Sequence, residues 1–259
     1  MESVHYYYDS TFDGFLSVVF YAFERNQQVQ KIEKEGAGVQ DLFSETVAVP
    51  TETAKAERVW KGLVKKTSAK NARLVQLAFM SELTDVEMLL WRYLRKVFTS
   101  QHPDFYQNML DEDVYNLMQT ARKVTKEAHR FQGFVRFQQT ADNIFFAPID
   151  PEHDILPLLI QHFKSRYADQ QWVIYDTRRK YGIYYDLKEV SEVQIENPEA
   201  DLQTGQLNED VKDKREDDYV ALWQRYYNSV NIASRENKKQ MTRLMPRRYW
   251  KYLPEKNRE

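Results

Sequence analysis

The stretch 134–195 carries the pattern that most restricts the fold of this chain. Residues 134–149 and 172–185 each place apolar or aromatic residues on both sides of a short polar turn, which predicts two β-hairpins. A helix between them begins near Pro157, because proline is tolerated in a first helical turn but not in a helix interior. Residues 190–195 add a further strand pattern. The order β-β-α-β-β predicts a mainly antiparallel sheet in 134–195.

The residues before this stretch are rich in helical patterns. Apolar residues recur at i, i+3, i+4 and i+7 in 12–23, 86–98 and 114–128, as expected for helices with one buried face. Thr84 and Glu87 have the spacing of a capping box, and Asp154 is expected to cap the helix that contains Pro157. Together these patterns predict an α+β fold with a helix-rich N-terminal half, and short strands are expected there at 6–8, 29–32 and 46–49.

Composition changes sharply near the C-terminal end. Residues 189–218 hold eleven acidic residues against three basic ones and few large apolar residues, which is typical of an acidic, mobile connection. Apolar residues then return at helical spacing in 219–230, and a basic, aromatic tail follows. We therefore expect an α+β core over 1–195, an acidic connection over 196–217, and a C-terminal helix and basic tail over 218–259 that pack on the core. Alternatively, the core divides into a helical part, 1–131, and a β-β-α-β-β part, 132–195.

Several kinds of site are excluded by composition. The chain of 259 residues has no cysteine, so disulfides, thiolate zinc sites, iron–sulfur clusters and thiol nucleophiles are absent from it. No metal site and no cofactor are predicted, because glycine-rich phosphate loops and histidine pairs at metal-ligand spacing are missing. We see no signal peptide and no apolar run near the ~20 residues of a membrane span, so a cytoplasmic protein without a membrane partner is expected.

Two basic segments are candidates for contact with nucleic acid. Arg178, Arg179 and Lys180 occupy a tight turn, from which arginines can reach phosphates. Basic and aromatic residues alternate near the C-terminus, a combination used to bind single strands, in Arg247, Arg248, Trp250 and Lys251. The net charge of −2 allows such a local basic face. The alternative is that the rings pack on the core and the arginines pair with acidic residues.

The histidines give weaker candidates for catalysis. Glu127, His129 and Arg136 could converge where the long helix meets the first strand, and a histidine oriented by a carboxylate can act as a general acid or base. A helix-end histidine beside ordinary surface charges explains the same residues. His153 and His162 are nine residues apart, which does not place two metal ligands on one helix face.

Three segments resemble a known family: YYYDSTFDGFLSVVFYAFE, the stretch 127–186, and NIASRENKKQMTRLMPRRYWKYLPE. They are similar to an uncharacterised bacterial family of DNA metabolism proteins, and the resemblance extends over most of the chain. It implies a link with a DNA-repair radical-SAM protein and with a uracil-DNA-glycosylase-like domain to which some members are fused. Because this chain has no cysteine, any radical-SAM cluster must belong to a partner.

Three functions follow from these observations. The first is an accessory protein in DNA metabolism or repair that contacts nucleic acid and acts with a radical-SAM partner. The second is an enzyme acting on a nucleobase or nucleotide through His129, His153 or His162. The third is a protein-interaction module without nucleic-acid binding, in which the acidic segment faces the partner.

Overall fold

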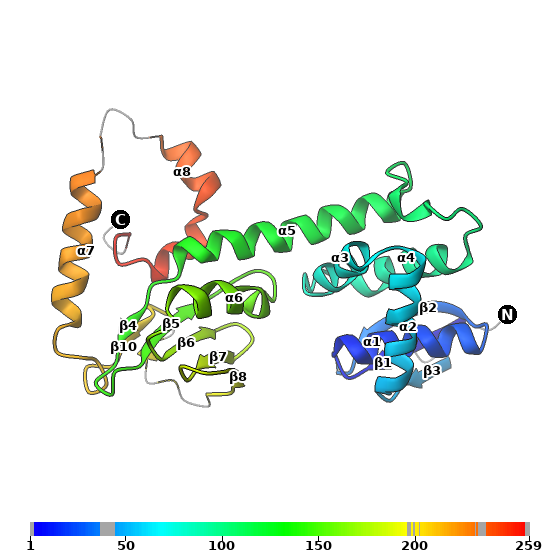
Figure 1. Cartoon of the computed structure of the whole chain (residues 1–259), viewed down its shortest axis with the longest axis horizontal. Coiled ribbons are helices and arrows are strands. Elements are labelled where there is room, and N and C mark those ends of the chain that lie inside the picture. The colour runs from blue at the N-terminus through cyan, green and yellow to red at the C-terminus, as the bar shows by residue number, and fades with distance from the viewer. Residues whose placement is uncertain are drawn as a thin grey trace. The chain divides into compact units, whose positions relative to one another are not determined.

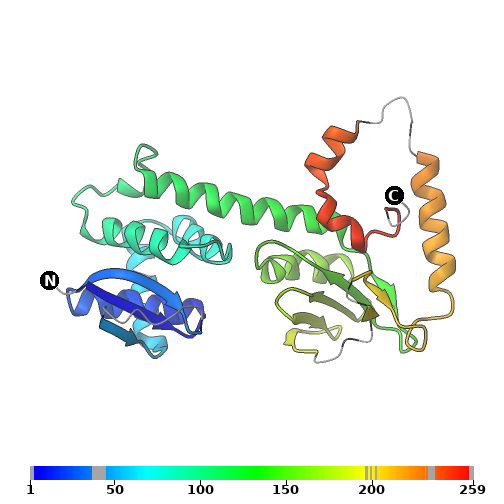
Figure 2. The same cartoon turned by 180° about the vertical axis from the view of Figure 1, so that it is seen from behind.

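The computed structural model describes residues 3–36, 45–195, 198, 200–201, 203–230, 232 and 237–256. The chain forms two compact units, Met1–Val124 and Thr125–Glu259, each with its own sheet (Figures 1 and 2). The division falls within helix α5 (Glu112–Phe134), and the residues on both sides of 195 belong to the second unit. The division into a core, an acidic connection and a C-terminal helix with its tail stays a prediction. Across the described ranges, every helix is too short or too polar to cross a membrane.

The first unit is built around a small parallel sheet. The strand order is β2-β1-β3, with β1 in the centre and parallel to both neighbours. β1 is buried through Val4, Tyr6 and Tyr8 on one face and through His5 on the other, as expected for a central strand covered on both faces. The elements are β1 (Ser3–Tyr8), α1 (Phe12–Glu24), β2 (Gln28–Lys34), β3 (Glu45–Ala48), α2 (Thr53–Lys66), α3 (Ala69–Phe79), α4 (Val86–Thr99) and the short 3-10 helix η1 (Phe105–Gln107).

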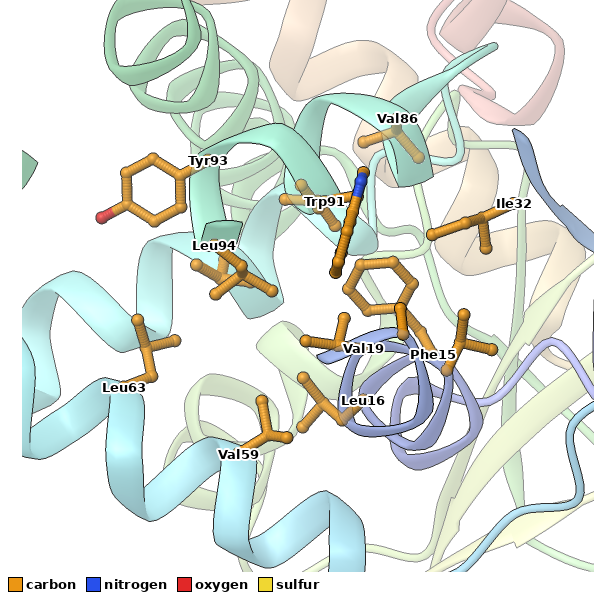
Figure 3. Close-up of a cluster of buried hydrophobic side chains, with 14 of the residues drawn as sticks. Phe15, Leu16, Val19, Ile32, Val59, Leu63, Val86, Trp91, Tyr93 and Leu94 are labelled. Atoms are coloured by element: carbon orange, nitrogen blue, oxygen red, sulfur yellow. The ribbon is translucent and has the colours of Figure 1, made fainter. Parts of the chain in front are cut away.

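The predicted apolar stripes of α1 and α4 form the core of this unit. Leu16 and Val19 of α1 lie toward α2 and α4, and Trp91 and Leu94 of α4 face them (Figure 3). All four side chains are buried. Burying a leucine-sized side chain stabilises a fold by ~1.5–3 kcal/mol, so this cluster is a main source of the unit's stability.

The predicted capping box at Thr84 and Glu87 is wrong. Helix α4 is capped at Asp85, which has a left-handed backbone (φ 61°) and makes no side-chain capping bond. The carboxylate of Glu87 is buried and accepts a hydrogen bond from the Tyr8 hydroxyl at 2.9 Å. A buried tyrosine hydroxyl needs an acceptor, and here that requirement outweighs the local capping pattern.

The second unit has a five-stranded sheet of order β4-β5-β6-β7-β8. Its neighbours are antiparallel except for β5 and β6, which are parallel and joined by helix α6. The predicted hairpin across 172–185 is confirmed as β6–β7. The sheet is mainly antiparallel, as predicted, and the fold is α+β. The elements are β4 (Gln138–Gln139), β5 (Phe145–Ile149), α6 (Leu156–Arg166), β6 (Trp172–Asp176), β7 (Tyr181–Tyr185) and β8 (Val190–Val193).

The two faces of this sheet are covered by different segments. Phe163 of α6 packs against Trp172 on one face, with ring centroids 6.1 Å apart. On the other face, Val173 and Tyr175 pack against Leu207. Leu207 belongs to the hairpin β9 (Ala200–Asp201) and β10 (Gln206–Leu207), so part of the acidic stretch covers the sheet.

The acidic stretch therefore has more structure where it is described than its composition indicates. Leu207 is 6% exposed, the carboxylate of Glu216 is buried, and residue 212 forms a bridge with Thr140. One well-placed leucine and a few hydrogen bonds suffice to attach a mostly polar segment. Residues 196–197, 199 and 202 of the predicted mobile connection lie outside the described residues. Early proteolytic cleavage in 197–216 stays a prediction.

Within the described residues, the second unit ends with two α-helices and a 3-10 helix. They are α7 (Glu216–Val230), α8 (Lys238–Leu244) and the 3-10 helix η3 (Arg247–Tyr252). The basic tail packs on the unit through Tyr249 and Leu253, which are 3% and 0% exposed. Helix α7 has the predicted apolar spacing, yet Leu222 and Tyr226 are more than half exposed.

Candidate functional site

Polar side chains gather where the parallel strands β5 and β6 end. Asp150 directly follows β5, and Asp176 is the last residue of β6. The carboxyl ends of parallel strands lie at one edge of a sheet, and such edges commonly hold binding sites. The loop 150–154 and the turn 177–180 form this edge, and η3 lies beside it through its contacts with Asp150 and Thr177.

Asp176 fixes the shape of the basic turn. Its carboxylate is fully buried and accepts the backbone N–H groups of Arg178 at 2.9 Å and Arg179 at 3.0 Å. It also pairs with Nη1 of Arg179 at 2.8 Å. Burial raises the pKa of Asp176, and the hydrogen bonds and charge of Arg179 offset only part of that effect. The turn is therefore held from within by a buried ion pair.

Arg179 has a structural role. Its side chain is only 11% exposed, and Nη2 donates to the carbonyl of Glu152 at 3.0 Å. It thus ties the turn after β6 to the loop after β5. The sequence analysis predicted that the basic side chains of this turn point outward. Arg179 instead faces inward, because the buried carboxylate of Asp176 needs a charged partner.

Asp150 joins the two predicted basic segments. One of its oxygens lies 3.3 Å from Nε of Arg178, and the other lies 2.7 Å from Nζ of Lys251. Both cations are partly exposed, at 50% and 37% of their side-chain surface. Arg178 pairs with Asp150 through Nε, and its guanidinium group has further N–H donors.

Glu127 holds the third cation of this group. Its carboxylate is 3% exposed and lies 2.9 Å from Nη2 of Arg248, which also pairs with Glu152 at 2.9 Å. It accepts the Tyr249 hydroxyl at 2.7 Å and the backbone N–H of His153 at 2.9 Å. One carboxylate thus connects α5, the loop after β5 and η3. We call Arg178, Arg248 and Lys251, with their partners Asp150 and Glu152, the edge cluster.

The pKa values around Glu127 reflect this network. Burial alone would raise the pKa of Glu127, but hydrogen bonds from Tyr249, the backbone N–H groups of Glu152 and His153, and Arg248 outweigh it and lower the pKa. Burial, together with the neighbouring carboxylate of Glu127, raises the pKa of Tyr249 to about 12. At neutral pH Glu127 is a charged acceptor and Tyr249 a neutral donor.

The remaining predicted binding residues lie near the edge cluster in sequence but differ in environment. Arg247 and Lys180 are exposed, and neither forms an ion pair within the described ranges. The Arg247 guanidinium lies 5.7 Å from the centre of the Trp250 ring. Trp250 is half-buried and donates its indole N–H to the carbonyl of Met245 at 3.1 Å. The ring therefore both stabilises the tail and presents part of its surface.

Glu127, His129 and Arg136, which the sequence suggested as a candidate catalytic group, contact different partners. Glu127 is buried, whereas His129 is exposed and contacts Gln132. Arg136 donates to Glu255 at 2.8 Å and lies over the Trp223 ring. Within the described residues, no hydrogen bond or ion pair joins any two of these three side chains. Two residues along a helix turn a side chain by about 200°, which explains the opposite directions of Glu127 and His129.

The other two candidate histidines lie at separate places. His153 is buried in the loop after β5, outside helix α6, which is capped at Ile155 and not at the predicted Asp154. Asp154 instead accepts a hydrogen bond from the Tyr181 hydroxyl. His162 is half-buried on α6 with its ring edge against Phe163. In the part of the chain that the structure describes, no group of three His, Asp or Glu residues could hold a metal ion.

Sequence reasoning missed the carboxylates of the site, Asp150, Glu152 and Asp176. A signal for two of them exists. Asp150 and Asp176 each stand at the end of an apolar strand, and β5 is joined to β6 through a helix, which is the arrangement of parallel strands. Once that pairing is recognised, both acids are expected at one edge of the sheet.

Comparison with protein families matches residues 84–255 to the domain of unknown function DUF4130. The match covers more than half of the chain, and the chain belongs to this family. The curated proteins contain no match. Among solved structures, the pGpG-specific phosphodiesterase PggH from Vibrio cholerae is similar at 9% identity and a TM-score of 0.35, over 89% of this chain and 100% of that chain. At this TM-score the similarity supports no conclusion about fold or function.

Proposed function

We propose that this member of the DUF4130 family is an accessory protein of DNA metabolism that binds nucleic-acid phosphates at the edge cluster. The observation that carries the proposal is the meeting of two basic segments, distant in sequence, on Asp150. Arg178 and Arg248 keep 50% and 41% of their side-chain surfaces exposed. Exposed guanidinium groups held by carboxylates at one end can bind phosphate at the other.

The carboxylates of the edge cluster favour weak binding of nucleic acid with little sequence preference. Asp150 and Glu152 offset part of the positive charge, so the cluster differs from the strongly basic surfaces of proteins that coat nucleic acid. The exposed Arg247 and the neighbouring Trp250 ring add a cation and a stacking surface. We therefore expect single strands to be preferred, with little sequence preference from the phosphate contacts themselves.

A pair of substitutions tests this proposal. Changing Arg178 and Arg247 together to alanine removes two exposed cations without touching the buried pair of Asp176 and Arg179. We expect affinity for a labelled single-stranded DNA to fall roughly five- to thirty-fold, because each lost phosphate contact removes part of the electrostatic attraction. Fluorescence anisotropy at one fixed salt concentration measures this affinity. Arg73→Ala, which removes an exposed arginine of α3 in the first unit, is the matched control. Equal affinities of the unaltered protein and the two variants would refute the edge cluster, with its neighbour Arg247, as the binding site.

The proposed accessory role in DNA metabolism also involves partner proteins. The family resemblance supports a radical-SAM partner and a uracil-DNA-glycosylase-like partner for the accessory role. A specific observation also favours a protein-interaction function: Leu222, Tyr226 and Val230 of α7 are 58%, 56% and 54% exposed. Exposed apolar groups on one helix are typical of a contact surface. Co-purification with the radical-SAM protein should weaken in a Leu222→Ala, Tyr226→Ala variant, and full retention would exclude α7 as the contact.

A further inference from the structure

A cavity of about 420 Å³ lies in the second unit, apart from the carboxylates of the edge cluster. Its walls come from α7, from residues 136–138 next to β4, from the turn between β9 and β10, and from the end of η3. The volume is within the range of sites for small ligands, ~300–1,000 Å³. Apolar atoms make up more of the lining surface than polar ones, and charged and amide side chains stand beside the aromatic rings.

The rings that line the cavity are held in place by their own contacts. The indole N–H of Trp223 donates to Glu255 at 2.8 Å, and the Arg136 guanidinium lies 5.0 Å from the centre of the same ring. The Tyr252 hydroxyl lies 3.1 Å from the Thr177 hydroxyl. Gly205 has φ +76°, and a Cβ there would lie 2.3 Å from the Tyr252 ring. Only glycine lets the β9–β10 turn approach this ring so closely. The cavity is therefore preformed, with aromatic rings among its walls.

The charged groups at the cavity are mainly acidic. Glu216 is 6% exposed and accepts the backbone N–H of Gln139 at 2.9 Å. Glu209 and Asp217 also line the cavity, and Lys212 is paired with both, at 2.7 Å and 3.0 Å. Arg136 is paired with Glu255. A phosphate inside would meet these carboxylates, so the charges favour a neutral, planar ligand that donates hydrogen bonds.

Helix η3 connects this cavity to the edge cluster. Tyr252 lines the cavity, and the Lys251 ammonium lies 4.7 Å from the centre of the Tyr252 ring. The same ammonium pairs with Asp150. A nucleotide with its phosphate at Lys251 therefore has its base within reach of the cavity, because the two groups of one nucleotide are separated only by a sugar.

We propose that the cavity binds the base of a single-stranded nucleic acid, and that it selects bases with an exocyclic amino group over thymine and uracil. This inference rests on the proposed function, since the phosphates of the same strand lie on the edge cluster. Trp223 and Tyr252 supply stacking surfaces, and Glu216 accepts the amino group. Carboxylates read such amino groups on cytosine, whereas the corresponding position of thymine is an acceptor.

The first test measures the affinity of the protein for four labelled strands by fluorescence anisotropy. The strands are homopolymers of deoxyadenosine, deoxycytidine and deoxythymidine, and a strand of abasic sites. We expect the deoxyadenosine and deoxycytidine strands to bind at least five-fold tighter than the other two. Trp223→Ala should lower the affinity for the deoxyadenosine and deoxycytidine strands roughly five- to 100-fold. Tyr115→Ala, which removes an exposed aromatic ring of the first unit that does not line the cavity, is the control. Glu216→Gln keeps an acceptor for Gln139 and should narrow the preference over deoxythymidine.

Two results separate this inference from the proposed function. If all four strands bind with equal affinity, and the Trp223→Ala and Tyr115→Ala proteins bind them equally well, the base site is refuted and the phosphate contact stands. If no strand binds, the phosphate contact is refuted, and the cavity is then judged by the indole N–H resonance of Trp223 in the unaltered protein. A shift with adenosine or cytidine but not with thymidine supports the base site; no shift with any nucleoside refutes it. The second measurement needs no variant to fold.

Discussion

Glu127 organises the site although it is too buried to meet a ligand. Four groups donate hydrogen bonds to its carboxylate: Tyr249, Arg248 and the backbone of Glu152 and His153. In sequence it is one acid on a long helix, and nothing in its neighbourhood distinguishes it from the exposed acids of the chain. The hydrophobic period predicts which face of α5 is buried, but not that a charged residue on that face receives partners from a loop and a tail far along the chain. Such partners are set by tertiary packing.

Changing Glu127 to glutamine should lower the free energy of unfolding by ~1–3 kcal/mol at pH 7, because an amide cannot satisfy all of these donors. The pKa of Glu127 is lowered from its usual 4.5 in the folded protein. Its contribution to stability is therefore present above pH 4.5 and is lost as the pH falls through the folded value. Urea unfolding at several pH values measures the effect.

The difference between Glu127→Gln and the unaltered protein should shrink as the pH falls below 4.5. Glu192→Gln, which changes an exposed acid of β8, should have little effect at any pH. A loss of stability at Glu127→Gln that is the same at pH 7 and at pH 3 would show that shape, and not charge, accounts for its role.

Helices and strands are predicted best where the apolar pattern that identifies them lies within one short segment of the chain. The hairpin β6–β7 and the stripes of α1 and α4 follow from alternation or helical period within a few residues. The parallel pairing of β5 with β6 was not predicted, because each strand pattern is local while pairing depends on the crossover through α6. The β9–β10 hairpin was also missed, since a single buried leucine is hidden among acidic residues. The edge cluster depends on the parallel pairing of β5 with β6, and the cavity beside Tyr252 depends on the β9–β10 hairpin.

The attachment of the acidic stretch gives a test at this scale. Leu207→Ala should lower the free energy of unfolding of the second unit by ~2–4 kcal/mol, because it leaves a cavity against Phe146, Val173 and Tyr175. Gln206→Ala, at an exposed neighbouring position, should change it by less than ~0.5 kcal/mol. Urea unfolding followed by far-UV circular dichroism compares the two. A Leu207 variant as stable as the Gln206 variant would mean that the hairpin adds little to the unit.

At the scale of the whole molecule, a net charge of −2 hides an uneven distribution of charge. The acids of the 189–218 stretch and the cations near the C-terminus belong to one unit, so the proposed binding of nucleic acid depends on a local surface and not on the total charge. The sequence predicted both basic segments, and the structure supplies what it lacked: carboxylates that orient the cations at one edge of the sheet.

The salt dependence of binding to single-stranded DNA tests this account most directly. If about four phosphates are contacted, the logarithm of the association constant should fall with the logarithm of salt concentration at a slope of roughly −3. Fluorescence anisotropy of the unaltered protein with a labelled strand, at four or more salt concentrations, measures that slope. A slope near −3 that becomes shallower in the Arg178→Ala, Arg247→Ala protein is the predicted result. Absence of salt-dependent binding by folded protein would contradict the account.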